Sequence, residues 1–201
     1  MTQNPWTIRA LLLDADGVVQ RAGGSFRGEL ARLIDPGSDL DAFIADVVAA
    51  EKPCLIGAAD FAVELTKVLE RWQSRRSVAD ALSIWTNLIV DESMIDTVGR
   101  LRDAGLYCCL ATNQHAQRAA YMSEQLSYGE IFDQEFYSCR VGRAKPDAEY
   151  FERVLAALQL PAHDVLFVDD HESNTAAARD VGINAAHIQP NAGAPAFIRL
   201  L

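Results

Sequence analysis

The chain has 201 residues, of which 50% are hydrophobic and 23% charged, and its formal net charge at pH 7 is −10. This composition is enough for a hydrophobic core of one or two domains, and it excludes a disordered or low-complexity protein. The acidic balance argues against broad binding to nucleic acid or to an anionic membrane, because either needs a basic patch. The only dense basic cluster is Arg71, Arg75 and Arg76. Apolar runs are far shorter than the roughly 20 residues of a membrane span.

The cysteines and the first residues indicate the compartment. Cys54, Cys108, Cys109 and Cys139 form no Cys-x-x-Cys pair, and two of them lie in an apolar run. This usage is typical of buried small side chains in a reducing compartment rather than of disulfides or zinc ligands. Residues Met1–Arg9, which include Trp6, lack the basic segment and the long apolar stretch of a signal peptide. We therefore expect a cytoplasmic protein.

The first predicted strand, Ile8–Leu13, is followed by a segment with helical character. Residues 17–90 contain no strand-like run but three amphipathic faces, which predicts a small helical bundle inserted after the first strand. The linker Gln20–Gly28, with Gly23 and Gly24, is the predicted hinge. The three faces are Leu40, Phe43, Ile44, Val47 and Val48; Phe61, Leu65, Val68, Leu69 and Trp72; and Val78, Leu82 and Trp85.

From Met94 onward, predicted strands and helices alternate. Continuous apolar runs favour a parallel sheet that is covered on both faces, so we expect a doubly wound α/β core of residues 1–16 and 91–201. Residues 17–90 would form the helical cap. The further predicted strands are Leu106–Ala111, Glu135–Ser138, Val165–Val168 and Ala185–Ile188. The predicted helices carry Ile95, Val98 and Leu101 before Gly105; Phe151, Val154, Leu155 and Leu158 with Pro146 near the first turn; and a segment capped by Ser173 or Asn174 that runs to Asp180 before Gly182.

Carboxylates follow two of these apolar runs. Asp14 and Asp16 come directly after the first strand, with Gly17 allowing an unusual backbone angle or a close approach. Asp169 and Asp170 follow the run Val165–Val168. Ligands bind at the carboxyl ends of strands in open α/β sheets. If the two strands are neighbours, the like charges need a cation, and Mg²⁺ suits a set of carboxylate oxygens. The alternative for Asp16 is a helix cap in a polar turn.

Neutral and cationic groups accompany these acids. Thr112 and Asn113 follow another strand and can hold phosphate oxygens, although such residues also serve as ordinary turn and cap residues. Lys145 precedes Pro146 and is one of only three lysines. Its cation can neutralise a carboxylate and a phosphate, the alternative being a solvated surface lysine. We expect His171 to be a surface residue or to lie beside the ligands, and no zinc-type ligand set is evident.

The order Asp-x-Asp, Thr-Asn, Lys-Pro and Asp-Asp, with Asn174 four residues after Asp170, resembles the haloacid-dehalogenase-like (HAD) hydrolase superfamily. The resemblance covers nearly the whole chain and implies a Rossmann-like core with a small helical cap of the first type. It implies that Asp14 is the nucleophile and Asp16 the general acid and base, which also offers its backbone carbonyl to Mg²⁺. Thr112, Asn113 and Lys145 would hold phosphate.

The resemblance also implies the metal ligands. Asp14, Asp16 and Asp170 would bind Mg²⁺, and Asp169 would assist directly or through water. Asn174 would orient the site, although relatives often have aspartate there.

The resemblance further implies a magnesium-dependent phosphatase that forms an aspartyl-phosphate on a small, sugar-phosphate-like metabolite. Asp16 favours this reaction over 2-haloacid dehalogenation, because a halide leaving group needs no proton. A phosphomutase or other phosphoryl transferase, and a non-catalytic binding module, stay open as alternatives. We expect the cap to cover the site, with Arg21 and Arg27 as candidate contacts of the leaving group. We expect a monomer, with a dimer left open, and no nucleic-acid or membrane partner.

Overall fold

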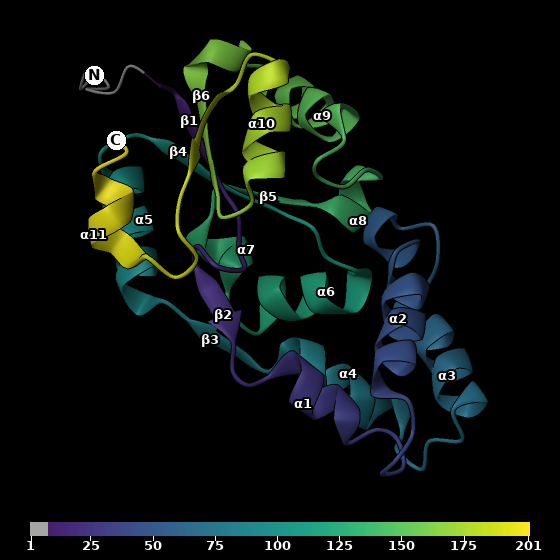
Figure 1. Ribbon diagram of the computed structural model, residues 1–201. Coiled ribbons are helices and arrows are strands. Elements are labelled where there is room, and N and C mark those ends of the chain that lie inside the picture. Colours follow the sequence, from purple (N-terminus) through teal and green to yellow (C-terminus); the bar gives the residue numbers. More distant parts are fainter. Residues whose placement is uncertain (1–7) are drawn as a thin grey trace.

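The computed structural model describes residues 8–201, and its core is a five-stranded parallel sheet in the order β5-β4-β1-β6-β7 (Figure 1). The predicted α/β sheet is therefore confirmed, with each strand close to its expected place. The expectation that Met1–Arg9 is not a signal peptide concerns mostly residues 1–7, Trp6 included, which lie outside the described residues. The strands are β1 Ala10–Leu13, β4 Tyr107–Thr112, β5 Gln134–Tyr137, β6 Val165–Asp169 and β7 Asn184–His187.

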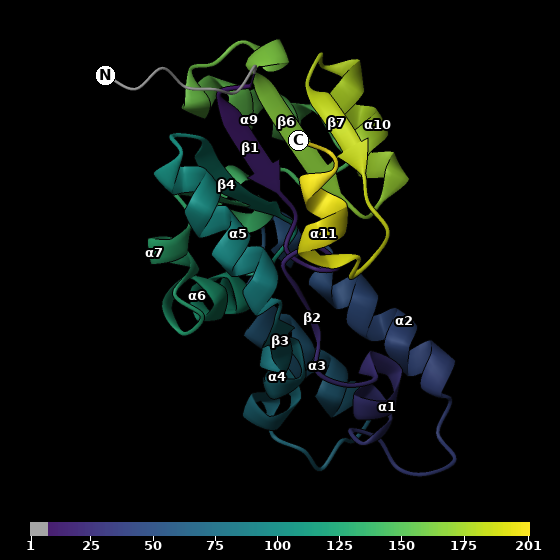
Figure 2. The ribbon, with the colours of Figure 1, turned by 90° about the vertical axis from the view of Figure 1, so that its left-hand side faces the viewer.

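Both faces of the sheet are covered, as the continuous apolar runs predicted. Leu11 and Leu13 belong to the hydrophobic cluster on one face, and Ala10 and Leu12 to the cluster on the other. Side chains alternate along a strand, so a strand between two helical layers must be apolar at every position. Figures 1 and 2 show these layers. One contains α5 (Glu92–Asp103) and α11 (Gly193–Ile198), and the other contains α9 (Ala148–Leu158) and α10 (Glu172–Asp180).

Two details of the helix starts differ from the predictions. His171 is the N-cap position of α10, whereas Ser173 and Asn174 lie inside the first turn. The Asn174 side chain is instead directed to Asp169, to which its amide donates. Pro146 precedes α9, which is capped by the Asp147 side chain. The shorter helical elements are α6 Ala116–Glu124, α7 Tyr128–Ile131, α8 Ser138–Val141 and η2 Ala162–Asp164.

The helical segment has a hydrophobic cluster of its own. Its elements are α1 Phe26–Ala31, α2 Leu40–Glu51, η1 Cys54–Ile56, α3 Phe61–Arg71 and α4 Val78–Thr86. Phe43, Phe61 and Trp85 are buried in this cluster, in agreement with the predicted faces. Val48 was also expected on the buried face of α2, but it is 52% exposed, because the contact face of this short helix is narrower than the apolar pattern.

The prediction that residues 17–90 contain no strand was wrong. Gln20–Ala22 (β2) and Leu88–Val90 (β3) pair in an antiparallel two-stranded ribbon. Each strand has only three residues and is partly exposed, so neither leaves a readable hydrophobic period in the sequence. The ribbon joins the outgoing and returning chain within the predicted hinge. The division of the chain at residues 17 and 90 stays a prediction.

The chemistry of the cysteines agrees with their expected role. All four are free thiols. Cys54, Cys108 and Cys109 are buried as expected, whereas Cys139 is only partly buried. Burial raises the pKa of the Cys108 thiol to about 12 and that of Cys54 to about 11, which keeps both uncharged. In the part of the chain that the structure describes, no helix has the length and apolar character needed to cross a bilayer.

His115 joins the core to the helical segment. It is the N-cap residue of α6, which lies between the sheet and helices α1–α4 (Figure 1). Its buried ring lies against Phe61 and Trp85, with centroid distances of 4.4 and 6.2 Å. Burial lowers the pKa of His115 to about 4, so the ring is neutral at pH 7.

We predict that replacing His115 flattens the pH dependence of stability. The unfolded chain takes up a proton below about pH 6.5, whereas the folded chain does so only near pH 4. Stability linked to His115 is therefore complete above pH 6.5 and is lost as the pH falls towards 4. Between pH 7.5 and 5, wild type should lose about 2 kcal/mol more than His115→Phe in urea unfolding.

His115→Phe also loses the N-cap of α6, which lowers the free energy of unfolding by the same amount at both pH values. Comparing the change between the two pH values cancels this contribution. His163→Gln is the matched control, because the His163 side chain is 80% exposed. Its unfolding curve should follow that of wild type at both pH values. Parallel pH dependences for wild type and His115→Phe would contradict the assignment.

Candidate functional site

The three central strands end side by side and bring the predicted site residues together. Leu13 of β1 is in register with Leu110 of β4 and Val168 of β6. The residues that follow these positions therefore meet at one edge of the sheet, where they border a cavity of about 360 Å³. Its lining residues are Asp14, Asp16, Thr112, Asn113, Lys145, Pro146, His171, Ser173 and Asn174.

Lys145 is the buried cation of this site. Its Nζ lies 2.8 Å from Asp14 Oδ1 and 2.6 Å from Asp169 Oδ2, and it donates to the Ala111 carbonyl oxygen at 2.8 Å. Burial alone would lower the pKa of Lys145, but the two carboxylates outweigh burial and raise it. The ammonium is therefore charged at neutral pH, and the alternative of a solvated surface lysine is excluded.

The ionisation of Asp14 reflects a balance of burial and charge. Burial raises its pKa to about 6, Lys145 opposes that rise, and Asp169 adds to it. Asp14 is thus a carboxylate at pH 7 held in a poorly solvated place beside a single ammonium. A carboxylate in such surroundings retains little hydration that would have to be removed before it reacts.

Asp169 is saturated with hydrogen bonds. Its oxygens accept from Asn174 Nδ2 at 3.1 and 3.0 Å, and Oδ1 also accepts from the His171 backbone N–H at 2.7 Å. Together with Lys145 Nζ, these donors fix the carboxylate. The position of Asn174 fits the predicted orienting role, and Asp169 itself orients Lys145.

An acidic cluster extends from Asp14 across to β6. Asp14, Asp169, Asp170 and His171 each offer a ligand atom, and these atoms lie within 4.8 Å of one another. Three carboxylates against one lysine leave an excess of negative charge, which a divalent cation would neutralise. The oxygen-rich donor set suits Mg²⁺ better than zinc.

Gly17 creates room for this cluster. Its φ angle is +79°, and a Cβ at this position would lie 2.1 Å from Asp170 Oδ2. Both roles considered for Gly17, the unusual backbone angle and the close approach, are therefore present. Asp170 in turn holds His171, whose Nδ1 lies 2.7 Å from Asp170 Oδ1. This hydrogen bond raises the pKa of His171, and the side chain is 67% exposed.

Asp16 lies apart from the acidic cluster. Its Oδ1 and Oδ2 accept from Arg118 NH2 and NH1 at 2.8 and 2.9 Å. Gln20 Nε2 and Gln114 Nε2 add one hydrogen bond each at 3.0 Å. These three partners were missed in the sequence. The place of Gln114 and Arg118 directly after the Thr-Asn pair was the available signal, since Gln114 precedes the His115 N-cap of α6 and Arg118 lies in the first turn of that helix.

The Thr-Asn pair has structural contacts. Asn113 Nδ2 donates to the Lys145 carbonyl at 2.8 Å, and Asn113 Oδ1 accepts from the Lys145 backbone N–H at 2.9 Å. Thr112 Oγ1 accepts from Gln114 Nε2 at 3.1 Å. The Asn113 side chain thus fixes the loop that carries Lys145, while the buried Thr112 hydroxyl faces the cavity.

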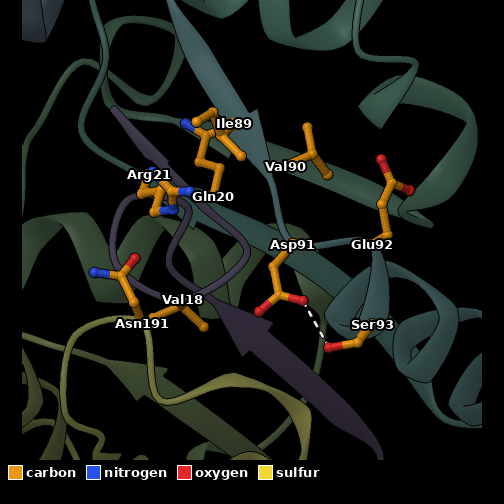
Figure 3. A pocket seen from close by; sticks show the side chains of 9 residues that line it. All are labelled: Val18, Gln20, Arg21, Ile89, Val90, Asp91, Glu92, Ser93 and Asn191. Carbon is orange, nitrogen blue, oxygen red and sulfur yellow. Dashed lines mark hydrogen bonds between the residues drawn. The ribbon is translucent and has the colours of Figure 1, made fainter. Parts of the chain in front are cut away.

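The two arginines considered for the leaving group lie elsewhere. Arg21 borders a separate hollow of about 410 Å³ beside the two-stranded ribbon, together with Gln20 and Asp91 (Figure 3). Arg27 pairs with Asp41 on the surface at 2.5 Å. Within residues 8–201, the lining of the acidic cavity includes no side chain of α1–α4. We expected the helical cap to cover the site, but helices α1–α4 do not line this cavity.

Comparisons with known proteins identify the family of the chain. A family model described as haloacid dehalogenase-like hydrolase matches residues 8–182. The chain is 32% identical over 98 residues to sesquiterpene phosphatase astK of Aspergillus oryzae, covering 49% of this chain and 50% of that protein. The chain spans half or less of the length of the curated relatives it matches.

Solved structures share the fold. The HAD family enzyme bt-2542 of Bacteroides thetaiotaomicron, as its magnesium complex, has a TM-score of 0.80 at 18% identity, covering 92% of this chain and 95% of that one. A protein described as a dehalogenase has a TM-score of 0.64 at 18% identity, covering 96% of this chain and 89% of that one.

We predict that Lys145→Met destabilises the fold, because two buried carboxylates lose their counter-charge. Removing one partner of a buried ion pair typically costs about 3–5 kcal/mol, which urea unfolding at pH 7 would measure. Lys67→Met is the control, since Lys67 forms an exposed pair with Glu64 and should change stability by less than about 1 kcal/mol. Equal stability of Lys145→Met and Lys67→Met would contradict the buried-cation interpretation.

Proposed function

Because the chain belongs to the haloacid dehalogenase-like hydrolase family, we propose that it is a magnesium-dependent phosphatase of small phosphorylated metabolites. The observation that carries the proposal is the position of Lys145 against Asp14, with Asp16 and Thr112 bordering the same cavity. The named phosphatase relative supports this reaction class. In this proposal residues 1–16 and 91–201 are the catalytic core and 17–90 the cap.

Asp14 is the nucleophile in the proposed reaction. One of its carboxylate oxygens attacks phosphorus, forming a bond to phosphorus while the bond between phosphorus and the leaving oxygen breaks. Lys145, 2.8 Å from Asp14, offsets the repulsion between the carboxylate and the incoming phosphate. Thr112 binds a phosphoryl oxygen through its hydroxyl, and Asn113 supports phosphate binding by holding the backbone of Lys145 in place.

Asp16 moves the protons. In the first step it gives a proton to the departing alkoxide, and in the second it takes one from the water that attacks the phosphorus of the aspartyl-phosphate. That attack breaks the bond to Asp14 and releases inorganic phosphate. Lys145 and Asp169 keep their contacts throughout, because neither gains nor loses a proton.

The acidic cluster fits a bound Mg²⁺. Asp14 and Asp170 would hold it with the Asp16 backbone carbonyl, and Asp169 would contribute through water, since its oxygens already accept four hydrogen bonds. The metal would supply charge neutralisation to the transferring phosphoryl group. The magnesium complex of the solved relative supports this choice.

Asp16 separates the proposed reaction from dehalogenation. A proton donor bordering the cavity serves an alkoxide leaving group, whereas a halide leaves unprotonated. A phosphomutase would use the same residues but must exclude water, and α1–α4 contribute no lining residue to the cavity within the described chain. Hydrolysis is therefore the reaction that we propose. The monomeric state and the cytoplasmic location stay predictions.

We predict that the chain releases phosphate from p-nitrophenyl phosphate only with Mg²⁺. Asp14→Asn should lower kcat by a factor on the order of 10³ or more, because the amide is not a nucleophile. Asp180→Asn, an exposed aspartate at the end of α10, should retain activity. Full activity of Asp14→Asn, or of wild type in excess chelator, would refute the proposed mechanism.

We predict that Mg²⁺ stabilises the folded chain through Asp170. A ligand at 100 times its Kd adds about 2.7 kcal/mol of stability, so Mg²⁺ should raise Tm by several degrees. Asp170→Asn should remove most of this shift. Glu172→Gln should retain it, because Glu172 lies outside the cluster and is 63% exposed. An undiminished shift in Asp170→Asn would place the ion elsewhere.

A further inference from the structure

We propose that Arg118 is a positioning residue that aims the Asp16 carboxylate, an inference that rests on the proposed phosphatase function. The guanidinium donates to both oxygens of Asp16, at 2.8 and 2.9 Å. A two-bond contact of this kind fixes the plane of a carboxylate as well as its distance. The Arg118 side chain is only 14% exposed, whereas Asp16 is 41% exposed and borders the cavity. Arg118 is therefore the buried partner of the pair, and Asp16 is the partner that borders the cavity.

Gln114 connects this pair to the proposed phosphate site. Its Oε1 accepts from Arg118 NH1 at 2.9 Å, while its Nε2 donates to Asp16 Oδ2 and to Thr112 Oγ1. One side chain thus touches the acid, the arginine and a hydroxyl that we assign to phosphate binding. This contact sets the position of Asp16 relative to Thr112, which a general acid requires, since it must reach the leaving oxygen of a phosphate held at a fixed point.

The helix that carries Arg118 is itself held by the helical segment. At the start of α6, His115 is buried against Phe61, and Gln117 Nε2 donates to Asp60 Oδ2 at 2.9 Å. Figure 1 shows α6 between the sheet and helices α1–α4. Glu51 of α2 is also close to Arg118. Burial raises the pKa of Glu51, and the positive charge of Arg118 opposes that rise. The position of Arg118, and with it that of Asp16, therefore depends on contacts from both sides.

The donors around Asp16 also determine how it can transfer a proton. Arginine has no lone pair to accept a hydrogen bond, so an Asp16 oxygen that carries a proton cannot direct it to Arg118. When Asp16 acts as the general acid, one of its oxygens still accepts a hydrogen bond from Arg118. The other oxygen no longer accepts hydrogen bonds from the protein and donates its proton to the leaving oxygen. The bond that is kept prevents the carboxyl group from turning away from the cavity.

The test compares leaving groups. Arg118→Gln should lower kcat/KM for phenyl phosphate about 100-fold, the lower end of what a general acid contributes, because kcat/KM includes the step in which the leaving group departs and not the later hydrolysis of the aspartyl-phosphate. With p-nitrophenyl phosphate the loss should stay below about 10-fold, because its leaving group is less basic and needs less proton donation. Arg118→Lys should recover part of the loss. Arg71→Gln, which removes an exposed pair with Asp46 in the helical segment, should behave as wild type.

A second comparison separates positioning from a general structural role. In an Asp16→Ala background, Arg118→Gln should cause no further loss of kcat/KM, because residues that act as a unit are not additive. Equal losses for both substrates, an additive loss in the double variant, or unchanged kcat/KM in Arg118→Gln would overturn the inference while leaving the phosphatase proposal intact. An inactive wild type towards both substrates would instead refute the proposed function and this inference with it.

Discussion

The contact on which this site depends is the burial of one ammonium group between two carboxylates. Lys145 Nζ reaches Asp14, Asp169 and the Ala111 carbonyl, and without it the charges of the two acids could not be buried so close together. That contact needs three strands in one order, since Ala111 and Asp169 lie in β4 and β6 and Asp14 directly follows β1. It also needs Asn113, which holds the Lys145 backbone with both ends of its amide. The topology of the sheet is therefore a condition for the electrostatics of the site.

Structural features that follow from a local sequence pattern could be predicted, whereas features that depend on residues far apart in the sequence could not. Apolar runs located every strand of the main sheet. The central strands are mostly apolar because they are covered on both faces, whereas the edge strands β5 and β7 include polar residues. The acidic pairs at two strand ends predicted a charge cluster once those strands were neighbours. The ribbon of β2 and β3 was missed because strands of three residues are too short to show a hydrophobic period. Val48 was misplaced because the pattern does not say which part of an apolar helix face contacts a partner.

Arg118 shows the same limit within the site. It lies 102 residues from Asp16 along the chain, and nothing in its own neighbourhood distinguishes it from a solvated arginine on a helix. The fold brings the two together because α6 follows β4, the strand next to β1. A helix that starts at the end of a neighbouring strand projects its first turn over the adjacent strand end. The spacing of Gln114 and Arg118 was visible in the sequence, but its meaning depended on the position of Asp16.

The two aspartates of the Asp-x-Asp motif differ because their partners differ. Ala15 is fully buried between them, and the side chains on either side of it lead to separate environments. Asp14 is almost covered and pairs with a lysine that it shares with Asp169, so its charge is balanced but poorly hydrated. Asp16 is partly open and is held by an arginine and two amides, all of which orient it without covering it. A nucleophile benefits from the first environment and a proton carrier from the second, because an attacking oxygen must lose its water whereas a proton must be able to enter and leave. A single intervening residue is thus enough to give two identical side chains different surroundings.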